Sequence, residues 1–246
     1  MVCRNPKYAQ EAQKELKEAS GNDQIFVHLL DMSDTKAVHK FATEFKEPLN
    51  VLINNAGCMI NERTLTDGGL EKNFATNTLG THVLTKELVP KLQKGSRVII
   101  VSSGGMLTQA QSVDDLNFEK MRPFDGTMAY AQNKRQQVVM TEQYAQQFPD
   151  VFFASMHPGW ADTPAVQSSM PDFHAKMKNK LRTVEQGADT IVWLALAQKP
   201  LELESGLFYQ DRVPVATHLP LAWSKSSPAD CKKLMEILDE MATKHS

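Results

Sequence analysis

A tyrosine and a lysine four residues apart, in the stretch Tyr130-Ala-Gln-Asn-Lys134, form the clearest chemical pair in the sequence. Two residues at this spacing on a helix project from the same face. An ammonium beside a phenol would stabilise the phenolate and lower the tyrosine pKa from its ordinary value of roughly 10. The pair therefore predicts a general acid or base that works closer to neutral pH. The alternative is a tyrosine packed at the edge of the core, with a lysine that extends its ammonium to solvent.

Two further polar residues could belong to the same site. Ser103 follows the apolar run 97–101, and its hydroxyl could hydrogen-bond a substrate oxygen. Asn77 lies on a helical face that is otherwise used for packing, so its amide needs partners, either a neighbouring carbonyl or an ordered water. Each residue also has an ordinary interpretation, Ser103 as the end of a strand and Asn77 as a structural asparagine.

The elements that must position these residues follow from hydrophobic patterning. Continuous apolar runs, typical of parallel strands buried on both faces, occupy 24–30, 49–53, 97–101 and 151–156. Helices are expected at 6–20, 33–46, 68–94, 127–148, 183–197 and 228–243. Thr183 with Gln186 predicts a capping box, and Ser227 before Pro228 predicts an N-cap. The alternation predicts an α/β fold with an open, doubly wound parallel sheet in one domain, residues 1–246.

Composition narrows the function further. The 246 residues carry a net charge of −2, with 41% hydrophobic and 23% charged residues, which gives no global attraction to nucleic acid. The three cysteines have no metal-ligand spacing, so no metal site is predicted and a reducing compartment is indicated. The longest apolar run, 190–197, is too short to span a bilayer. We therefore expect a soluble, cytoplasmic protein.

Five motifs in order give the chain a family resemblance. They are NNAG at 54–57, NTLG at 77–80, VSSGG at 101–105, YAQNK at 130–134 and HPGWADT at 157–163. With this order and spacing the chain resembles the short-chain dehydrogenase/reductase family, and within it the branch related to retinol dehydrogenases. The resemblance implies a Rossmann-like fold and an oxidoreductase that transfers hydride between a nicotinamide dinucleotide and a carbonyl or alcohol.

The resemblance also implies roles for individual residues. Tyr130 would exchange the proton, Lys134 would lower the tyrosine pKa and bind the nicotinamide ribose, Ser103 would orient the substrate oxygen, and Asn77 would hold a relay water. The remaining cofactor contacts that it implies are Asp31 at the adenine, Asn54, Ala56 and Gly57 on the adenine-ribose side, and Pro158, Gly159 and Thr163 at the nicotinamide.

One part of the family pattern is missing from the sequence. The family's glycine-rich turn, TGxxxGxG, does not occur before NNAG. Counting elements back from NNAG makes residues 1–4 the end of the family's second strand, so the first strand, the glycine-rich loop and the first helix are expected to be absent. This predicts a shortened form that arises by alternative start or alternative splicing. Arg4, just after that strand, lies where the family usually contacts a 2′-phosphate, which would favour NADP over NAD; the alternative is an exposed arginine beside a helix start.

Two functions remain open at this stage. The first is an NADP(H)-dependent oxidoreductase, with NAD as an alternative cofactor, that acts on a small and apolar carbonyl or alcohol. The second is a catalytically silent short form that acts, if at all, through partner binding. The family often pairs through helices that correspond to 68–94 and 127–148, so a homo-oligomer is one assembly that the resemblance implies. The loops expected to meet substrate contain Met106, Leu107, Met121, Phe124, Trp160, Met170, Phe173 and Met177, which could equally pack on the core.

Overall fold

The strands of the computed structural model, which describes residues 1–245, form two separate groups. The first pairs β1 (Val2–Cys3) with β2 (His28–Leu29). The second has the order β3-β4-β5-β6-β7, with only the last pair antiparallel. Its strands are β3 (Leu49–Asn54), β4 (Leu92–Val101), β5 (Phe152–His157), β6 (Phe208–Gln210) and β7 (Val213–Pro214). This is the expected Rossmann-like α/β fold.

The helices connect these strands largely as predicted. They are α1 (Pro6–Ser20), α2 (Thr35–Glu44), α3 (Lys72–Phe74), α4 (Gly80–Leu88), α5 (Gly126–Gln147), α6 (Pro164–Ser169), α7 (Pro171–Met177), α8 (Val184–Leu196) and α9 (Pro228–His245). A π-helical turn, Ala75–Leu79, joins α3 to α4. The Thr183–Gln186 capping box is present, and Ser227 accepts a hydrogen bond from the Asp230 N–H at 3.1 Å. Both predicted helix starts are therefore confirmed.

The centre of the core lies between β4, β5 and α5. Val98, Ile99 and Ile100 of β4 are inaccessible to solvent, and so are Phe153 and Ala154 of β5. The strands are buried on both faces, as their continuous apolar runs predicted. This packing fixes the carboxyl ends of β4 and β5, and those ends carry the polar residues of interest.

One edge of β1 and one edge of β3 are open. The observed strand orders are β1-β2 and β3-β4-β5-β6-β7, so β1 and β3 are both edge strands. Within residues 1–245 no strand pairs with the second edge of β1 or of β3. Leu29 of β2 is 56% exposed and Ile53 of β3 is 43% exposed, so each strand group carries an exposed apolar side chain. That further elements are absent from the chain stays a prediction.

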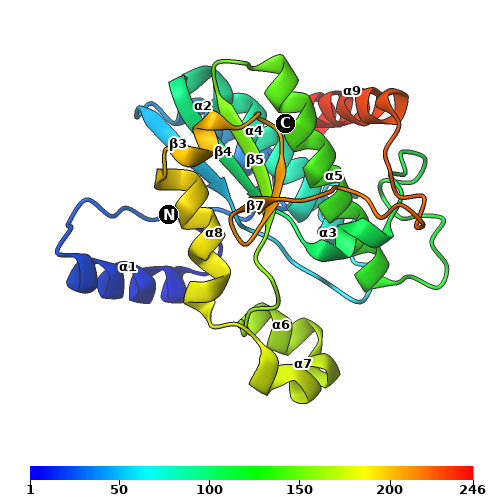
Figure 1. Cartoon of the computed structure of the whole chain (residues 1–246), viewed down its shortest axis with the longest axis horizontal. Coiled ribbons are helices and arrows are strands. Elements are labelled where there is room, and N and C mark those ends of the chain that lie inside the picture. The colour runs from blue at the N-terminus through cyan, green and yellow to red at the C-terminus, as the bar shows by residue number, and fades with distance from the viewer. Residues whose placement is uncertain (246) are drawn as a thin grey trace.

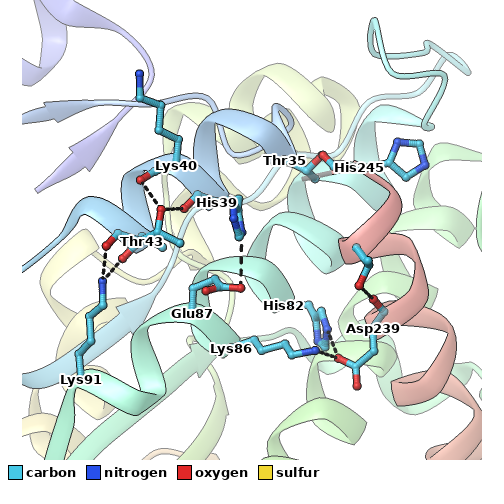
Figure 2. A network of polar contacts seen from close by, with 12 residues as sticks. Thr35, His39, Lys40, Thr43, His82, Lys86, Glu87, Lys91, Asp239 and His245 are labelled. Carbon is cyan, nitrogen blue, oxygen red and sulfur yellow. Dashed lines mark hydrogen bonds and ion pairs between the residues drawn. The ribbon is translucent and has the colours of Figure 1, made fainter.

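Helix α9 packs across α4 and α5 on the other side of the molecule (Figures 1 and 2). Its buried residues include Leu234 and Leu238. Asp239 accepts a hydrogen bond from Lys86 at 2.6 Å and lies 3.0 Å from Nε2 of His82. The hydrogen bond with His82, together with Lys86, holds the pKa of Asp239 at about 2. The helices that the resemblance implies for subunit pairing are thus partly covered by the chain itself, and a homo-oligomer stays a prediction.

A helix that crosses a membrane must be both long and apolar. No helix within residues 1–245 is long enough and apolar enough to cross a bilayer.

Candidate active site

A cavity of about 470 Å³ opens at the carboxyl ends of β3, β4 and β5, where the sheet topology predicts a ligand. Helix α5 forms one wall, and the loop before α6 forms another. The cavity brings together most of the predicted site. The predicted residues that line it are Ala56, Gly57, Ser103, Tyr130, Lys134, Pro158, Gly159 and Thr163.

Lys134 is buried in the wall of this cavity rather than extended to solvent. Its ammonium donates hydrogen bonds to the Val101 carbonyl at 2.8 Å and to Oε1 of Gln137 at 3.1 Å. It also lies 5.3 Å from the centre of the Tyr130 ring. Burial disfavours the charged form and lowers the pKa of Lys134 to about 8. The helical spacing thus places lysine and tyrosine together, as predicted, and the solvent-reaching alternative does not describe this lysine.

The tyrosine pKa differs from the sequence-based expectation. Burial raises the pKa of Tyr130 to about 12, although a hydrogen bond with Ser103 acts in the opposite direction. The prediction of a lowered tyrosine pKa was therefore wrong for the chain by itself. The reason is that desolvation penalises the phenolate more than the neighbouring groups stabilise it. At neutral pH Tyr130 holds its proton, which suits a donor to a carbonyl oxygen.

Asn77 lies behind the cavity, in the π-helical turn, and does not line it. Its Oδ1 accepts from the Cys58 N–H at 2.8 Å, and its Nδ2 donates to the Cys58 carbonyl at 2.8 Å. A Cβ on Gly57 would come within 3.1 Å of the same Oδ1, so the glycine permits this close packing. Asn77 fixes the loop after β3, which supports the structural interpretation; its role with a relay water stays a prediction. A π-helical turn at such a position is frequent in functional sites.

Three predicted cofactor residues lie outside the cavity. Asn54 is buried and donates to the Thr85 hydroxyl at 3.0 Å, so it anchors β3 to α4 instead of lining the cavity. Arg4 and Asp31 follow β1 and β2 and form an ion pair at 3.9 Å. Burial raises the pKa of Asp31, but hydrogen bonds from Ser33 and the charge of Arg4 outweigh it, and the net pKa is lowered.

The loop after β5 forms the opposite wall of the cavity. Gly159 has a positive φ of 76°, and a Cβ there would come within 2.6 Å of the Arg182 guanidinium. Arg182 donates to Asp211 at 2.6 and 2.9 Å and to the Pro158 carbonyl at 3.3 Å. Thr163 caps α6 by accepting from the Val166 N–H at 3.3 Å. Arg182 thus lies against Pro158 and Gly159, and Thr163 ends the same loop as the N-cap of α6.

Helices α6 and α7 project from the body of the molecule beside the cavity (Figure 1). Ser169 of α6 donates to the Met59 carbonyl at 3.0 Å, which joins this segment to the loop after β3. Trp160 packs on Phe173 with ring centres 4.5 Å apart. Of the apolar loop residues named from sequence, Trp160 and Met170 line the cavity. Met106, Met121 and Phe124 pack on the core instead, which was the alternative interpretation.

Sequence reasoning missed three residues of the site. Cys58, directly after NNAG, and His157, the first residue of the HPGWADT motif, line the cavity, but the sequence reasoning gave neither a role. Burial lowers the pKa of His157 to about 4, with help from Arg182, so its ring is neutral. Gln137 contacts Lys134 from one turn further along α5. The three-residue spacing of Lys134 and Gln137 was the available signal, since residues three apart share a helix face.

Comparison with known proteins shows to which family the chain belongs. A family model for short chain dehydrogenases matches residues 1–114. The chain is 56% identical over 246 residues to "Dehydrogenase/reductase SDR family member 12" of Homo sapiens, covering 98% of this chain and 77% of that protein. The chain belongs to the short-chain dehydrogenase/reductase family. Another family member, retinol dehydrogenase 11 of Homo sapiens, is 30% identical over 218 residues, covering 86% of this chain and 68% of that protein.

Two solved structures agree with the fold. An uncharacterized protein from Mycobacterium paratuberculosis superimposes with a TM-score of 0.73 at 25% identity, over 99% of this chain and 83% of that one. A short chain dehydrogenase from Shigella flexneri 2a, complexed with NADP, gives a TM-score of 0.65 at 18% identity, over 86% of this chain and 85% of that one. At that identity the second likeness concerns the fold alone.

The residues present fit one end of a nicotinamide dinucleotide better than the other. The cavity offers the Lys134 ammonium beside the Tyr130 phenol, which the family resemblance assigns to the nicotinamide ribose, and the Gly159 turn, which it assigns to the nicotinamide. The pyrophosphate end needs backbone N–H groups at a helix N-terminus. Helix α1, the first after a strand, begins with Pro6, which has no N–H, and residues 1–48 contain no glycine-rich turn.

Proposed function

We propose that the chain is a short-chain oxidoreductase that works on a carbonyl or alcohol with NADP(H). The observation that supports this best is the group Ser103, Tyr130 and Lys134 in a single cavity, with the lysine ammonium 5.3 Å from the tyrosine ring. A bound nicotinamide supplies or takes the hydride. The protein supplies orientation and the proton.

The proposed roles follow from the protonation states. Tyr130, protonated at neutral pH, donates its phenolic proton to the substrate carbonyl oxygen during reduction. Ser103, which hydrogen-bonds Tyr130, orients the same oxygen. The Lys134 ammonium compensates the phenolate that is left behind, and in the oxidative direction each proton moves the opposite way. The lining of Trp160, Met170 and Val166 favours an apolar substrate.

Arg4 supports the choice of NADP over NAD within this proposal. Its guanidinium is exposed and already close to Asp31, beyond the carboxyl ends of β1 and β2. A guanidinium at this position would pair with a 2′-phosphate, whereas an acidic residue would favour the free ribose hydroxyls of NAD.

A second function is favoured by a specific observation, the poor fit of residues 1–48 to a pyrophosphate. Under this proposal the chain retains the fold and the catalytic side chains but does not bind the dinucleotide tightly, and it acts by binding a partner. The open edges of β1 and β3 are consistent with such a role.

Titration of NADPH into the 246-residue chain separates the two functions. Thermal stability and cofactor fluorescence are followed together, with NADH as the comparison. Binding raises stability by about 2.7 kcal/mol at a hundredfold excess over Kd. No response at millimolar NADPH would exclude the enzyme proposal for this chain and leave the second function.

If NADPH binds, Tyr130→Phe tests the proton donor. The variant should keep cofactor binding and lose turnover of an aliphatic aldehyde or ketone by about 10²–10⁴-fold, the usual contribution of a positioned acid. Tyr8→Phe is the matched control, because Tyr8 is 67% exposed on α1. Retained turnover in Tyr130→Phe would refute the assignment.

A further inference from the structure

Gln137 connects two segments of the site that are far apart in the sequence. It lies one turn after Lys134 on α5 and is inaccessible to solvent. Its Oε1 accepts from the Lys134 ammonium at 3.1 Å, and its Nε2 donates to the Asn77 carbonyl at 2.7 Å. The carboxamide thus links Lys134 to the π-helical turn that holds the loop after β3.

The contacts of the ammonium show what this link does. An ammonium has three N–H groups, and burying it is costly unless they are hydrogen-bonded. The Val101 carbonyl takes one and Gln137 takes another, both from the wall of the cavity. The third N–H remains for the cavity side, which Tyr130 also lines. Without Gln137, the buried Lys134 ammonium would keep only the Val101 carbonyl as a fixed acceptor and could rotate about that hydrogen bond.

We propose that Gln137 is a positioning residue for proton transfer at Tyr130, holding the Lys134 ammonium in place and tying it to the backbone at Asn77. The proposal rests on the proposed oxidoreductase function and deepens it. An amide nitrogen donates but does not accept a hydrogen bond, so the Lys134–Gln137–Asn77 link transmits orientation and not a proton.

The chain contains a matched control beside Gln137. Gln136 is also buried on α5, and its Oε1 accepts from the Thr78 hydroxyl at 2.7 Å in the same π-helical turn. It therefore makes a comparable bridge between the same two segments, with its Oε1 bonded to Thr78 and not to Lys134. An effect on the lysine in Gln137→Met but not in Gln136→Met separates positioning from general packing.

The experiment measures the titration of Lys134 by NMR in the 246-residue chain with carbon-13-labelled lysine, assigned with Lys134→Arg. The titratable groups that face this ammonium are Tyr130 and Cys58, so the series is repeated with Cys58→Ser. In Gln137→Met the midpoint should fall by about one pH unit, because an acceptor for the charged form is lost. Gln136→Met should leave it unchanged.

Gln137→Glu provides a second arm if the methionine variant does not fold. Its carboxylate should raise the Lys134 midpoint by about one unit or more, because it retains an acceptor and adds an opposite charge. An unchanged midpoint in either Gln137 variant, or equal shifts in Gln136→Met and Gln137→Met, would overturn the proposal. These readouts need neither NADPH nor turnover, so a chain that fails the NADPH titration still gives a separate answer for Gln137. Where turnover is present, the pH profile of kcat should move with the lysine midpoint.

Discussion

Two regions of the molecule differ sharply in how they are held. The central unit, made of β4, α5 and β5, has strands buried on both faces and carries the candidate site residues Ser103, Tyr130 and Lys134. The N-terminal unit, residues 1–29, has two strands of two residues each and one helix, α1, whose buried residue is Ala9. Leu16, Phe26 and Leu29 of this unit are largely exposed.

This difference teaches that the cavity and the segment that carries Arg4 depend on separate groups of strands. Tyr130 and Lys134 lie on α5 and Ser103 follows β4, so all three depend mainly on the central unit. Arg4, at the end of β1, depends on a strand pair with little apolar burial. Since hydrophobic burial is the main stabilising contribution in folding, the central unit should keep its geometry under conditions that loosen the N-terminal unit.

The largest expected contrast comes from one phenylalanine in each unit. Phe153 of β5 is inaccessible to solvent and stacks on Tyr144 with ring centres 5.6 Å apart. Phe153→Ala should reduce the free energy of unfolding by about 3–5 kcal/mol, because it removes buried surface and leaves a cavity. Phe26→Ala should reduce the free energy of unfolding by less than about 0.5 kcal/mol, because Phe26 is 61% exposed.

Urea denaturation followed by tryptophan fluorescence measures both variants. Circular dichroism recorded in parallel tests whether the chain unfolds in one transition, which the free energies require. Comparable losses for Phe153→Ala and Phe26→Ala would show that the N-terminal unit is bound as firmly as the central unit, and the contrast between the regions would then fail.

A smaller effect is expected where the segment after β2 meets α4. A Cβ on Gly80 would come within 2.0 Å of the Met32 carbonyl oxygen, a backbone atom that cannot turn aside. Gly80→Ala should therefore cost about 1–3 kcal/mol of stability through overpacking. Gly68→Ala is the control, because its nearest neighbour would lie at 3.6 Å.

Hydrogen exchange shows where the strain in Gly80→Ala is relieved. If the comparison of the two regions is right, amides of residues 28–38 should exchange faster while those of β4 and β5 stay protected. Uniform loss of protection across the chain would instead mean that both regions unfold as one unit.

The sequence predicted the central unit well, for reasons that particular elements illustrate. The run 151–156 corresponds to β5 at Phe152–His157, and the segment 127–148 corresponds to α5 at Gly126–Gln147. Both are buried by surrounding elements, so local pattern and tertiary packing agree. In the run 24–30 only His28–Leu29 form a strand, because the neighbouring strand β1 has only two residues to pair with it. Pattern cannot show how long a partner strand is.

The site was predictable in residue identity and less so in electrostatics. Helical spacing was enough to bring Lys134 to Tyr130, because both lie on α5. The raised pKa of Tyr130 depends on burial by residues from several segments, which spacing does not reveal. Gln137 was missed for a similar reason, since its partner Asn77 is 60 residues away and lies in a π-helical turn.

The smallest expected effect is on pH dependence, and it arises in the central unit. Burial, with the charge of Arg182, lowers the pKa of His157 to about 4, while an unfolded histidine titrates at roughly 6.5. Between these values the unfolded chain binds more protons than the folded one, so the free energy of unfolding falls as pH drops below about 6.5. At pH 5.5 one such histidine has lowered the free energy of unfolding by roughly 1 kcal/mol.

His157→Asn should therefore flatten the stability profile between pH 7.5 and 4.5, measured by urea denaturation at each pH. His82 is buried as well and its pKa is lowered, chiefly by desolvation, so it contributes with the same sign and some slope should remain. Residues of the N-terminal unit should keep the same hydrogen exchange at pH 7.5 and 5.5 once the intrinsic pH dependence is subtracted. An unchanged slope in His157→Asn would mean that this ring is already hydrated in the folded chain. A Cβ on Gly104 would come within 3.0 Å of Nε2 of His157. The packing between these two residues would then be looser than in the rest of the central unit.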